Sequence, residues 1–424
     1  MSAAPLPRSR VVLVLAASVV VSHGLVTLAL PDVRSHDSAA WETVAALLKA
    51  NQNPYATTEF VSWPPFWMQI VGGLGWVADT TGASFNLVLK VFLAAVEVVA
   101  AVALYGVIQR HFPTRRALAV VLIGFTLNPV VVMVQTLHGN FDILVALWVI
   151  LFLGTMLDHK ASDDPVLHLL ACFYVGLGIL TKTVPVVLVP LLLPGFLAAG
   201  RRHRTLAVAL VLGPAVLASS VVFALDAGSA AERILRYDST PGFFGITGLL
   251  DAMGADAASR SFADQFRWVL AAVLGAFTVF VVRHGVPLRD DLTRCVACLM
   301  ALIPVWGSGY GPQYLLWFLP VLVLLHLSGT TLERRLLIAA FVTATLTCIV
   351  EYAVIPSHGA FALTSHSAGW LHALSERVST PAGATLLRLP LFAVLVALTV
   401  AMAARYVGSA RSAQLQADEE HRGT

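Results

Sequence analysis

The sequence predicts an all-α polytopic membrane protein with about twelve transmembrane helices. Of its 424 residues, 58% are hydrophobic and only 12% are charged, and the mean hydropathy is +0.81. Soluble domains carry about 25% charged residues, so this composition is typical of a membrane protein. The net charge of +3 is small and the basic residues are scattered near the ends of apolar runs. No nucleic-acid partner is therefore expected, and membrane lipids surround the chain.

The apolar runs define the individual spans, because a helix needs about 20 apolar residues to cross a bilayer. Each run ends at charged residues, proline or glycine. The expected spans are 11–30, 84–109, 117–136, 141–157, 165–182, 183–199, 205–225, 266–282, 292–306, 312–328, 335–353 and 388–406. Arg8 and Arg10 precede the first span and Pro31 follows it, which favours a retained anchor over a cleaved signal peptide.

The distribution of Lys and Arg predicts the orientation of these spans. The short basic loops RHFPTRR, RRHR and TLERR fall on one side of the membrane, and such loops stay in the cytoplasm. Both termini are therefore expected in the cytoplasm, with one domain over residues 1–410 and a cytoplasmic tail over 411–424. The richness in Ala, Val, Leu and Arg is typical of a high-GC bacterium, so the expected location is a bacterial plasma membrane. This orientation requires residues 165–199 to form two short spans that meet near Lys182.

The polar segments that carry chemically active side chains all fall on the opposite, outer side. They are residues 31–83, 138–142, 182, 226–265, 307–313 and 354–387. Polar groups at membrane depth are costly unless they face a cavity or one another. We therefore expect a site at the extracytoplasmic face of the membrane.

The first outer loop, residues 31–83, is predicted to fold as a cap. From Ser38 onward the apolar residues recur at helical spacing, so a short helix should lie along the membrane interface. The run Asn53-Pro54-Tyr55 should end this helix, because proline cannot continue it. A second apolar helical segment should follow from Trp63 to Ala78, since Trp residues favour the interface.

These segments resemble a known group of enzymes. Asp37 after the first span, the short helix, Asn53-Pro54-Tyr55 and Pro64-Pro65 resemble the polyprenol-phosphate-sugar-dependent glycosyltransferases of the C superfamily, especially glycosyltransferase family 87 and related mannosyltransferases. The segments GNFDILVALWVILFL, LTKTVPVVLVPLLL and GPQYLLWFLPVLVLL are similar to the Gly-x-x-Asp, Lys-x-x-Pro and Gln-Tyr-x-x-x-x-x-Pro segments of that family. The resemblance implies the C-superfamily fold and inverting transfer of a sugar, expected to be mannose.

The resemblance also implies the substrates. A polyprenyl-phosphate sugar would be the donor and a glycolipid or glycan the acceptor. The lipid-linked sugar is a co-substrate and no other cofactor is expected, although the sequence leaves a divalent metal requirement open. The oligomeric state is not predicted.

The resemblance gives Asp37 the role of catalytic general base. The carboxylate would take the proton of the acceptor hydroxyl, and a well-placed base contributes about 10²–10⁴-fold to a rate. Many superfamily members carry paired acidic residues here, whereas this chain has His36 beside Asp37 and Asp32 five residues earlier. Asp32 is the fallback base. The structural alternative is that Asp37 only caps the helix, for which Asp is a favoured residue.

The departing polyprenyl phosphate needs positive charge in a water-poor site. Lys182 is the first candidate, because it ends a span at the depth of a lipid phosphate and Lys binds phosphate as a point charge. The alternative is that Lys182 extends to the lipid headgroups. The other donor phosphate-binding candidates are Arg236, His358 and His366.

The remaining polar candidates would bind the sugar or the acceptor, and they are His36, Tyr55, His138, Asp142, Tyr237, Tyr310 and Gln313. Asp142 could equally be a helix-start carboxylate that the helix dipole favours. Tyr310 could anchor the chain at the interface, and Tyr237 could belong to an ordinary turn.

Two other classes of function share these features. A twelve-span secondary transporter, or a lipid or glycan flippase, would show related halves and charges in the middle of spans. The two halves are not similar, and charge in the middle of a span is limited to Glu97. A catalytically inactive assembly subunit of the same fold is the other alternative, because fold does not fix function.

Overall fold

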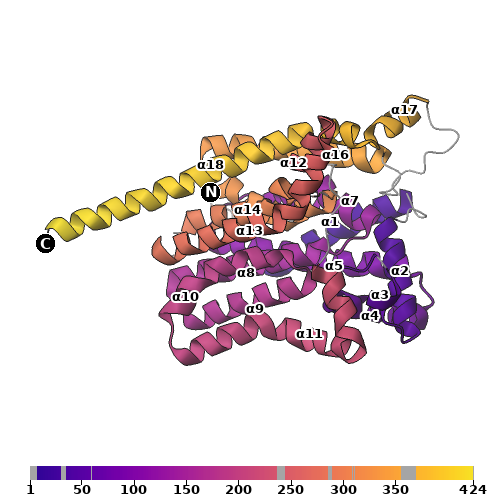
Figure 1. The fold of residues 1–424 in the computed structure, drawn as a ribbon, viewed down its shortest axis with the longest axis horizontal. Coiled ribbons are helices and arrows are strands. Elements are labelled where there is room, and N and C mark those ends of the chain that lie inside the picture. The colour runs from indigo at the N-terminus through magenta and orange to yellow at the C-terminus, as the bar shows by residue number, and fades with distance from the viewer. Residues whose placement is uncertain are drawn as a thin grey trace.

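The computed structural model describes residues 7–29, 35–58, 60–235, 244–284, 289–307, 309, 311–354 and 369–423. Within these ranges the secondary structure is helical and no strand is present, which confirms the predicted all-α class. Most of the long helices lie roughly along one common direction and form an elongated bundle (Figure 1).

The elements follow the chain from the first apolar run to the last. They are α1 (Arg8–Ala29), α2 (His36–Lys49), α3 (Pro54–Thr57), α4 (Pro65–Thr81), α5 (Phe85–His111), α6 (Ala117–Val121), η1 (Leu122–Thr126), α7 (Pro129–Met133), η2 (Val134–His138), α8 (Asp142–Ser162), α9 (Pro165–Thr181), η3 (Val184–Leu192), α10 (Leu193–Ala198), α11 (Arg201–Leu235), α12 (Gly245–Ala252), α13 (Asp256–His284), α14 (Arg289–Trp306), η4 (Pro312–Trp317), α15 (Leu319–Ser328), α16 (Thr331–Val354), α17 (Gly369–Val378) and α18 (Pro381–Gly423).

Six helices in the described residues are long and apolar enough to cross a membrane, and the count is seven if one bent helix pair is a single span. They include α1, α5, α8, α13, α16 and α18. Of the other predicted spans, 165–182, 183–199 and 312–328 correspond to shorter or broken helices, and 292–306 corresponds to the 18-residue α14. The predicted span 205–225 lies inside the 35-residue helix α11. The chain is therefore a multi-pass membrane protein, and the number of twelve spans is not confirmed.

The predicted span 117–136 is a broken helix. Its two halves, Ala117–Thr126 and Pro129–His138, meet at an angle of 44°. The break has a local cause, because Pro129 lacks an N–H and the side chain of Asn128 caps the second half by accepting from the backbone N–H of Val130. Each half ends in a π-helical turn, η1 and η2, and π-helical turns often mark functional positions. The second turn ends at His138.

Residues 165–198 form two antiparallel segments, as predicted. Helix α9 ends at Thr181, and Lys182 has extended backbone angles before η3 begins. Pro185 and Pro190 remove N–H donors from η3, which is a 3₁₀-helix. The imidazole Nε2 of His168, near the start of α9, is 3.0 Å from the carbonyl oxygen of Leu192 at the end of η3. Lys182 therefore lies at the turn between the two segments.

The first outer loop contains the two expected helices, α2 and α4, and between them a short helix, α3, where the sequence predicted only a turn. An aromatic cluster fixes it to the bundle. The ring centroid of Trp41 lies 4.4 Å from that of Trp63 and 5.5 Å from that of Trp67. The ring of Trp67 stacks on that of Phe141, with 4.2 Å between their centroids. Trp41 and Trp67 are fully buried, so the cap is packed against the start of α8.

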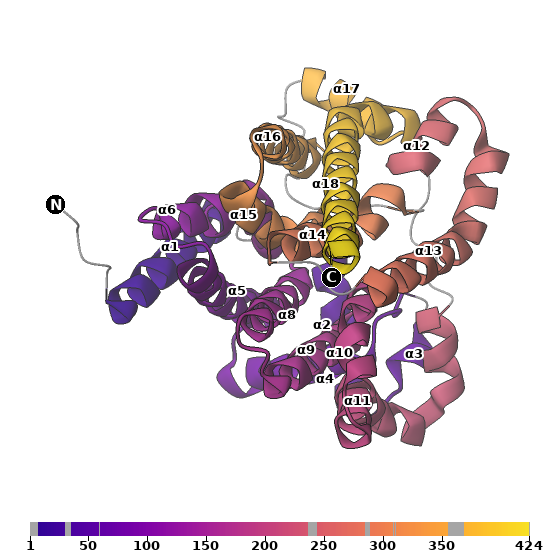
Figure 2. The ribbon, with the colours of Figure 1, turned by 90° about the vertical axis from the view of Figure 1, so that its left-hand side faces the viewer.

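The bundle has two distinct ends. Helix α8 runs from Asp142 at one end to the other end, where Asp158 contacts both Arg110 and His111 at the close of α5. The cap helices α2, α3 and α4 lie at the first end, and α10 and the C-terminus lie at the opposite end (Figure 1). Seen from that opposite end, α1, α5 and α6 lie on one side and α12 and α13 on the other (Figure 2).

Two predicted outer loops are largely helical where they are described. Within 226–265, α11 continues to Leu235, α12 follows, and α13 begins at Asp256. Within 354–387, α17 and the start of α18 are helical.

Candidate functional site

A cavity of about 240 Å³ lies at the end of the bundle that carries α2. Its polar side is lined by Asp37, Ser62, Asn140, Lys182 and Gln313. Its other lining residues are Trp63, Pro64, Thr183, Val184, Ile234, Phe266, Leu270, Ile303, Gly309, Tyr314 and Trp317. The cavity thus joins one carboxylate and one ammonium group to aromatic and aliphatic walls.

Asp37 lies in the first turn of α2, but it does not cap the helix. The cap is Ser35, whose hydroxyl oxygen accepts the backbone N–H of Ser38 at 3.0 Å. The alternative interpretation of Asp37 as a capping residue is therefore wrong. Its Oδ2 is 3.1 Å from Nε2 of His138 and accepts the side-chain N–H of Asn140 at 2.6 Å. Oδ1 has no hydrogen-bond partner among the described residues, so one carboxylate oxygen of this cavity-lining residue is held and the other is free to accept a proton.

The surroundings of Asp37 keep it ionised. Burial alone raises the pKa of this carboxyl, because it removes the charged form from water. The charge and hydrogen bond of His138, the hydrogen bond of Asn140 and the charge of Lys182 outweigh that effect, so the pKa lies below its ordinary value of 3.8. At neutral pH Asp37 is a carboxylate with 18% of its side chain exposed.

His138 is fixed behind Asp37. Its Nδ1 lies 2.8 Å from the hydroxyl of Tyr352 on α16, and its backbone carbonyl accepts the hydroxyl of Ser35. Gly139 follows with φ +66°, and a Cβ there would lie 3.1 Å from Cβ of Ser38. A glycine is therefore required for this turn to pack against α2. His138 is buried, does not line the cavity, and contacts Asp37 from behind.

Lys182 points into the protein. Its ammonium group donates to Oδ1 of Asp142 at 2.7 Å and lies over the rings of Phe141, Tyr314 and Trp317, at 5.5, 5.1 and 4.8 Å from the ring centroids. Only 12% of the Lys182 side chain is exposed, and Asp142 is fully buried. Lys182 therefore does not extend to the lipid headgroups. Asp142 lies behind Lys182 and fixes it, instead of lining the cavity.

The other predicted site residues have different surroundings. His36 is exposed at the first position of α2. Tyr55 is buried and its hydroxyl donates to the backbone carbonyl of Trp63 at 2.6 Å, so it supports the loop beside the cavity. Gln313 lines the cavity. The residues Arg236, Tyr237, Tyr310, His358, His366 and the fallback base Asp32 lie outside the described residues.

Sequence reasoning missed several contributors to the cavity. Asn140 donates directly to Asp37. Its place in the sequence, between the candidates His138 and Asp142, could have indicated this role. Trp63 and Trp317 also line the cavity, whereas the sequence placed Trp63 in an interfacial segment and Trp317 within the span 312–328. In the described part of the chain, no three His, Cys, Asp or Glu side chains converge as metal ligands would.

Comparisons with known proteins agree with this architecture. Residues 81–225, about a third of the chain, match the family described as dolichyl-phosphate-mannose-protein mannosyltransferase. No functionally curated protein matches the sequence. The fold is similar to the crystal structure of ArnT from Cupriavidus metallidurans bound to undecaprenyl phosphate. The TM-score is 0.50 and the identity is 15%, over 94% of this chain and 76% of that chain.

A second solved structure is more distant. The oligosaccharyltransferase of Archaeoglobus fulgidus, tethered with an acceptor peptide, gives a TM-score of 0.42 at 14% identity, over 92% of this chain and 55% of that chain. The likeness to ArnT confirms the predicted C-superfamily fold. Together with the family match it supports a glycosyltransferase of that class. Membership of glycosyltransferase family 87 and specificity for mannose stay predictions.

Proposed function

We propose that this protein transfers a sugar, expected to be mannose, from a polyprenyl-phosphate donor to a glycolipid or glycan acceptor, with inversion, at the extracytoplasmic face. One observation carries the proposal: Asp37 and Lys182, from distant parts of the chain, line a single cavity at one end of a membrane-spanning bundle. The match of residues 81–225 to a family of polyprenol-type mannosyltransferases supports the donor class.

The proposed chemistry uses both charged groups. Oδ1 of Asp37 accepts the proton of the acceptor hydroxyl while the hydroxyl oxygen bonds to the anomeric carbon. The bond from that carbon to the phosphate oxygen breaks, and its electron pair leaves with the polyprenyl phosphate. Attack opposite the leaving group inverts the anomeric configuration. Lys182 lies close enough to lower the pKa of Asp37, and its positive charge stabilises the leaving phosphate.

The aromatic side chains that line the cavity fit a sugar next to a phosphate. Trp63, Tyr314 and Trp317 bring aromatic side chains to the cavity, and Gln313 brings an amide. Aromatic faces pack against the apolar faces of sugar rings while amides pair with hydroxyl groups. These side chains would bind the transferred sugar between the base and the ammonium group.

The apolar side of the cavity continues as a track suited to a prenyl chain. A second cavity, of about 300 Å³, shares Phe266 and Leu270 with the first. A third, of about 320 Å³, shares Val273 and Leu302 with the second. The three cavities follow α13 from Phe262 toward Phe280, about 27 Å at 1.5 Å per residue. That length is close to the hydrocarbon thickness of a bilayer, about 30 Å.

The proposal is tested by product formation. The purified protein is incubated with a panel of polyprenyl-phosphate sugars and membrane extract, and new products are identified by mass. We expect one donor to yield a sugar-bearing product. Solute or lipid movement into proteoliposomes without any product, under conditions where the protein is folded, would instead favour a transporter or flippase.

The same experiment distinguishes an active transferase from a catalytically inactive assembly subunit. A folded protein that binds donor and yields no product with any acceptor would contradict the proposed activity. Asp37→Asn is the negative control for product formation, because it removes the proposed base and keeps the size of the side chain.

A further inference from the structure

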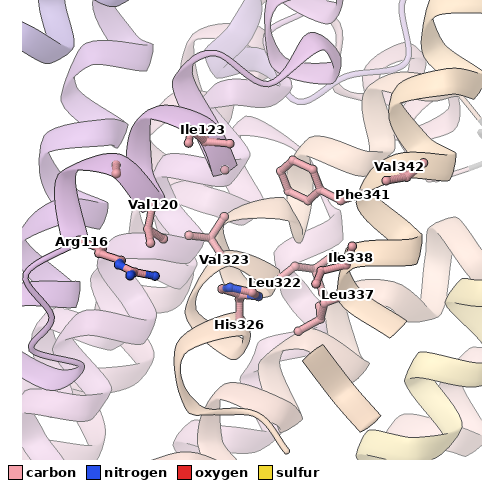
Figure 3. A pocket seen from close by; sticks show the side chains of 12 residues that line it. Arg116, Val120, Ile123, Leu322, Val323, His326, Leu337, Ile338, Phe341 and Val342 are labelled. Atoms are coloured by element: carbon pink, nitrogen blue, oxygen red, sulfur yellow. The ribbon is translucent and has the colours of Figure 1, made fainter. Parts of the chain in front are cut away.

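A separate apolar groove lies on another face of the bundle, between α6 and η1 on one side and α15 and α16 on the other (Figure 3). Its volume is about 390 Å³. Val120, Ile123, Val323 and Phe341 form much of its wall. Ile123 is 69% exposed and belongs to the bent helix pair that is apolar enough to cross a membrane, so the groove opens on the outer surface of the bundle.

The groove has basic side chains at one end only. Arg116 directly precedes α6 and His326 lies in the last turn of α15, and Figure 3 shows the two side chains on the same side of the groove. Both are exposed. Among the described residues no carboxylate lies within ion-pair distance of Arg116 or His326. The rest of the lining is apolar or glycine and presents no side-chain charge to compensate them.

This basic end is remote from the proposed catalytic cavity. The chain runs from Arg116 through the bent span to His138, and His138 contacts Asp37. Arg116 therefore lies at the opposite end of the bundle from Asp37. The groove extends from Arg116 to Gly124, about 12 Å along the helix at 1.5 Å per residue. That is less than half of the hydrocarbon thickness, so the groove stays within one leaflet.

Local sequence explains why the groove exists. At Gly124 an added Cβ would lie 3.0 Å from Cγ2 of Val323, so α15 approaches η1 closely at the inner end of the groove. Nearer the basic end, Ala119 is small and leaves room between α6 and the side chains of α16. The result is a narrow channel that opens beside Arg116 and His326.

We propose that this groove binds a glycerophospholipid with an anionic headgroup from the leaflet at that end of the bundle. One acyl chain lies along the apolar wall and the phosphate lies between Arg116 and His326. Charge complementarity selects the headgroup, because anionic lipids are attracted to basic residues at a membrane surface. A zwitterionic lipid fills the same channel but gains less from the two basic groups.

The test measures lipid retention by native mass spectrometry of the full chain, with phosphatidylglycerol and phosphatidylcholine that carry identical acyl chains. We expect wild type to retain phosphatidylglycerol preferentially. Arg116→Gln should weaken that retention about five-fold, the effect of one basic residue near a membrane surface, and leave phosphatidylcholine unchanged. Arg115→Gln is the matched control, since Arg115 is an exposed neighbour that does not line the groove.

A second variant separates the groove from general surface charge. Ala119→Trp should obstruct the channel and reduce retention of both lipids, with the folded state checked by thermal unfolding. Equal retention of the two lipids by wild type, or an equal loss in Arg115→Gln and Arg116→Gln, would overturn the proposal. Displacement of the retained lipid by millimolar inorganic phosphate would also overturn it, because the acyl chain would then contribute nothing.

Discussion

Lys182→Met leaves the fully buried Asp142 without the ammonium group that lies 2.7 Å from it. Removing one partner of a buried ion pair costs about 3–5 kcal/mol, because the other charge stays buried and unpaired. Asp142→Asn should cost less. The ammonium group would keep three aromatic rings, centred 4.8 to 5.5 Å away, and each cation–π contact contributes about 0.5–2 kcal/mol.

The double variant provides the decisive comparison. Lys182→Met with Asp142→Asn removes both charges, so it should be more stable than Lys182→Met alone. We expect a coupling free energy of about 2–3 kcal/mol, at the upper end for residues in contact. The free energy of unfolding is measured in the same mixed micelles for the wild type, both single variants and the double variant.

A matched control exists on the cap. Lys49 and Asp79 form an ion pair at 2.7 Å, but their side chains are 69% and 54% exposed. Exposed pairs contribute about 0–1 kcal/mol, so the same cycle at Lys49 and Asp79 should give a small coupling. Additive effects at Lys182 and Asp142, or equal costs for their two single variants, would refute the reasoning.

Three further predictions concern the base, the membrane core and the donor. The pKa of Asp37 lies below 3.8, so the proposed activity should be lost as the pH falls through that lowered pKa. Asn140→Ala removes a hydrogen bond that lowers this pKa, so it should move the acid limb of the pH–rate profile to higher pH. An unchanged acid limb would exclude the contribution of Asn140. The carboxylate of Glu97 on α5 lies 2.8 Å from Nε2 of His23 and accepts a hydrogen bond from Gln135. Glu97→Ala should therefore lower the free energy of unfolding by about 3–5 kcal/mol, and Glu97→Gln should lower it clearly less. Equal losses in the two variants would show that the charge of Glu97 does not contribute to stability. Val273→Trp should narrow the apolar track, so the KM for long-chain prenyl donors should rise while the KM for a short-chain analogue stays constant. Equal changes in KM for the two donors would argue against the track.

The general fold could be predicted from the sequence because its signals are local. Apolar runs and the helical spacing after Ser38 depend on neighbouring residues alone, and they predicted the bundle and the cap helices α2 and α4. The break at Lys182 could also be predicted, since the basic loop at 201–204 had to return to the same side. The π-helical turns on both sides of Pro129 could not, because an apolar run has the same composition in an α-helix and a π-helix.

The site could be predicted only in part, for a similar reason. Sorting polar residues by side of the membrane predicted that Asp37 and Lys182 share one end of the bundle, and they line one cavity. The contact of His138 with Tyr352 joins residues 214 positions apart, and no local pattern indicates it. Whether a polar residue lines the cavity or supports one that does depends on packing. His138 and Asp142 were therefore predicted to bind substrate, whereas each contacts a cavity residue from behind.

The rate of sugar transfer by Asp37→Asn, with donor binding measured on the same sample, tests the role of this carboxylate. Asp79→Asn, an exposed carboxylate on α4 of the same cap, is the matched control. We predict that Asp37→Asn binds donor as the wild type does and transfers sugar about 10²–10⁴-fold more slowly, while Asp79→Asn keeps the wild-type rate. Transfer at the wild-type rate by a folded Asp37→Asn variant would contradict the account.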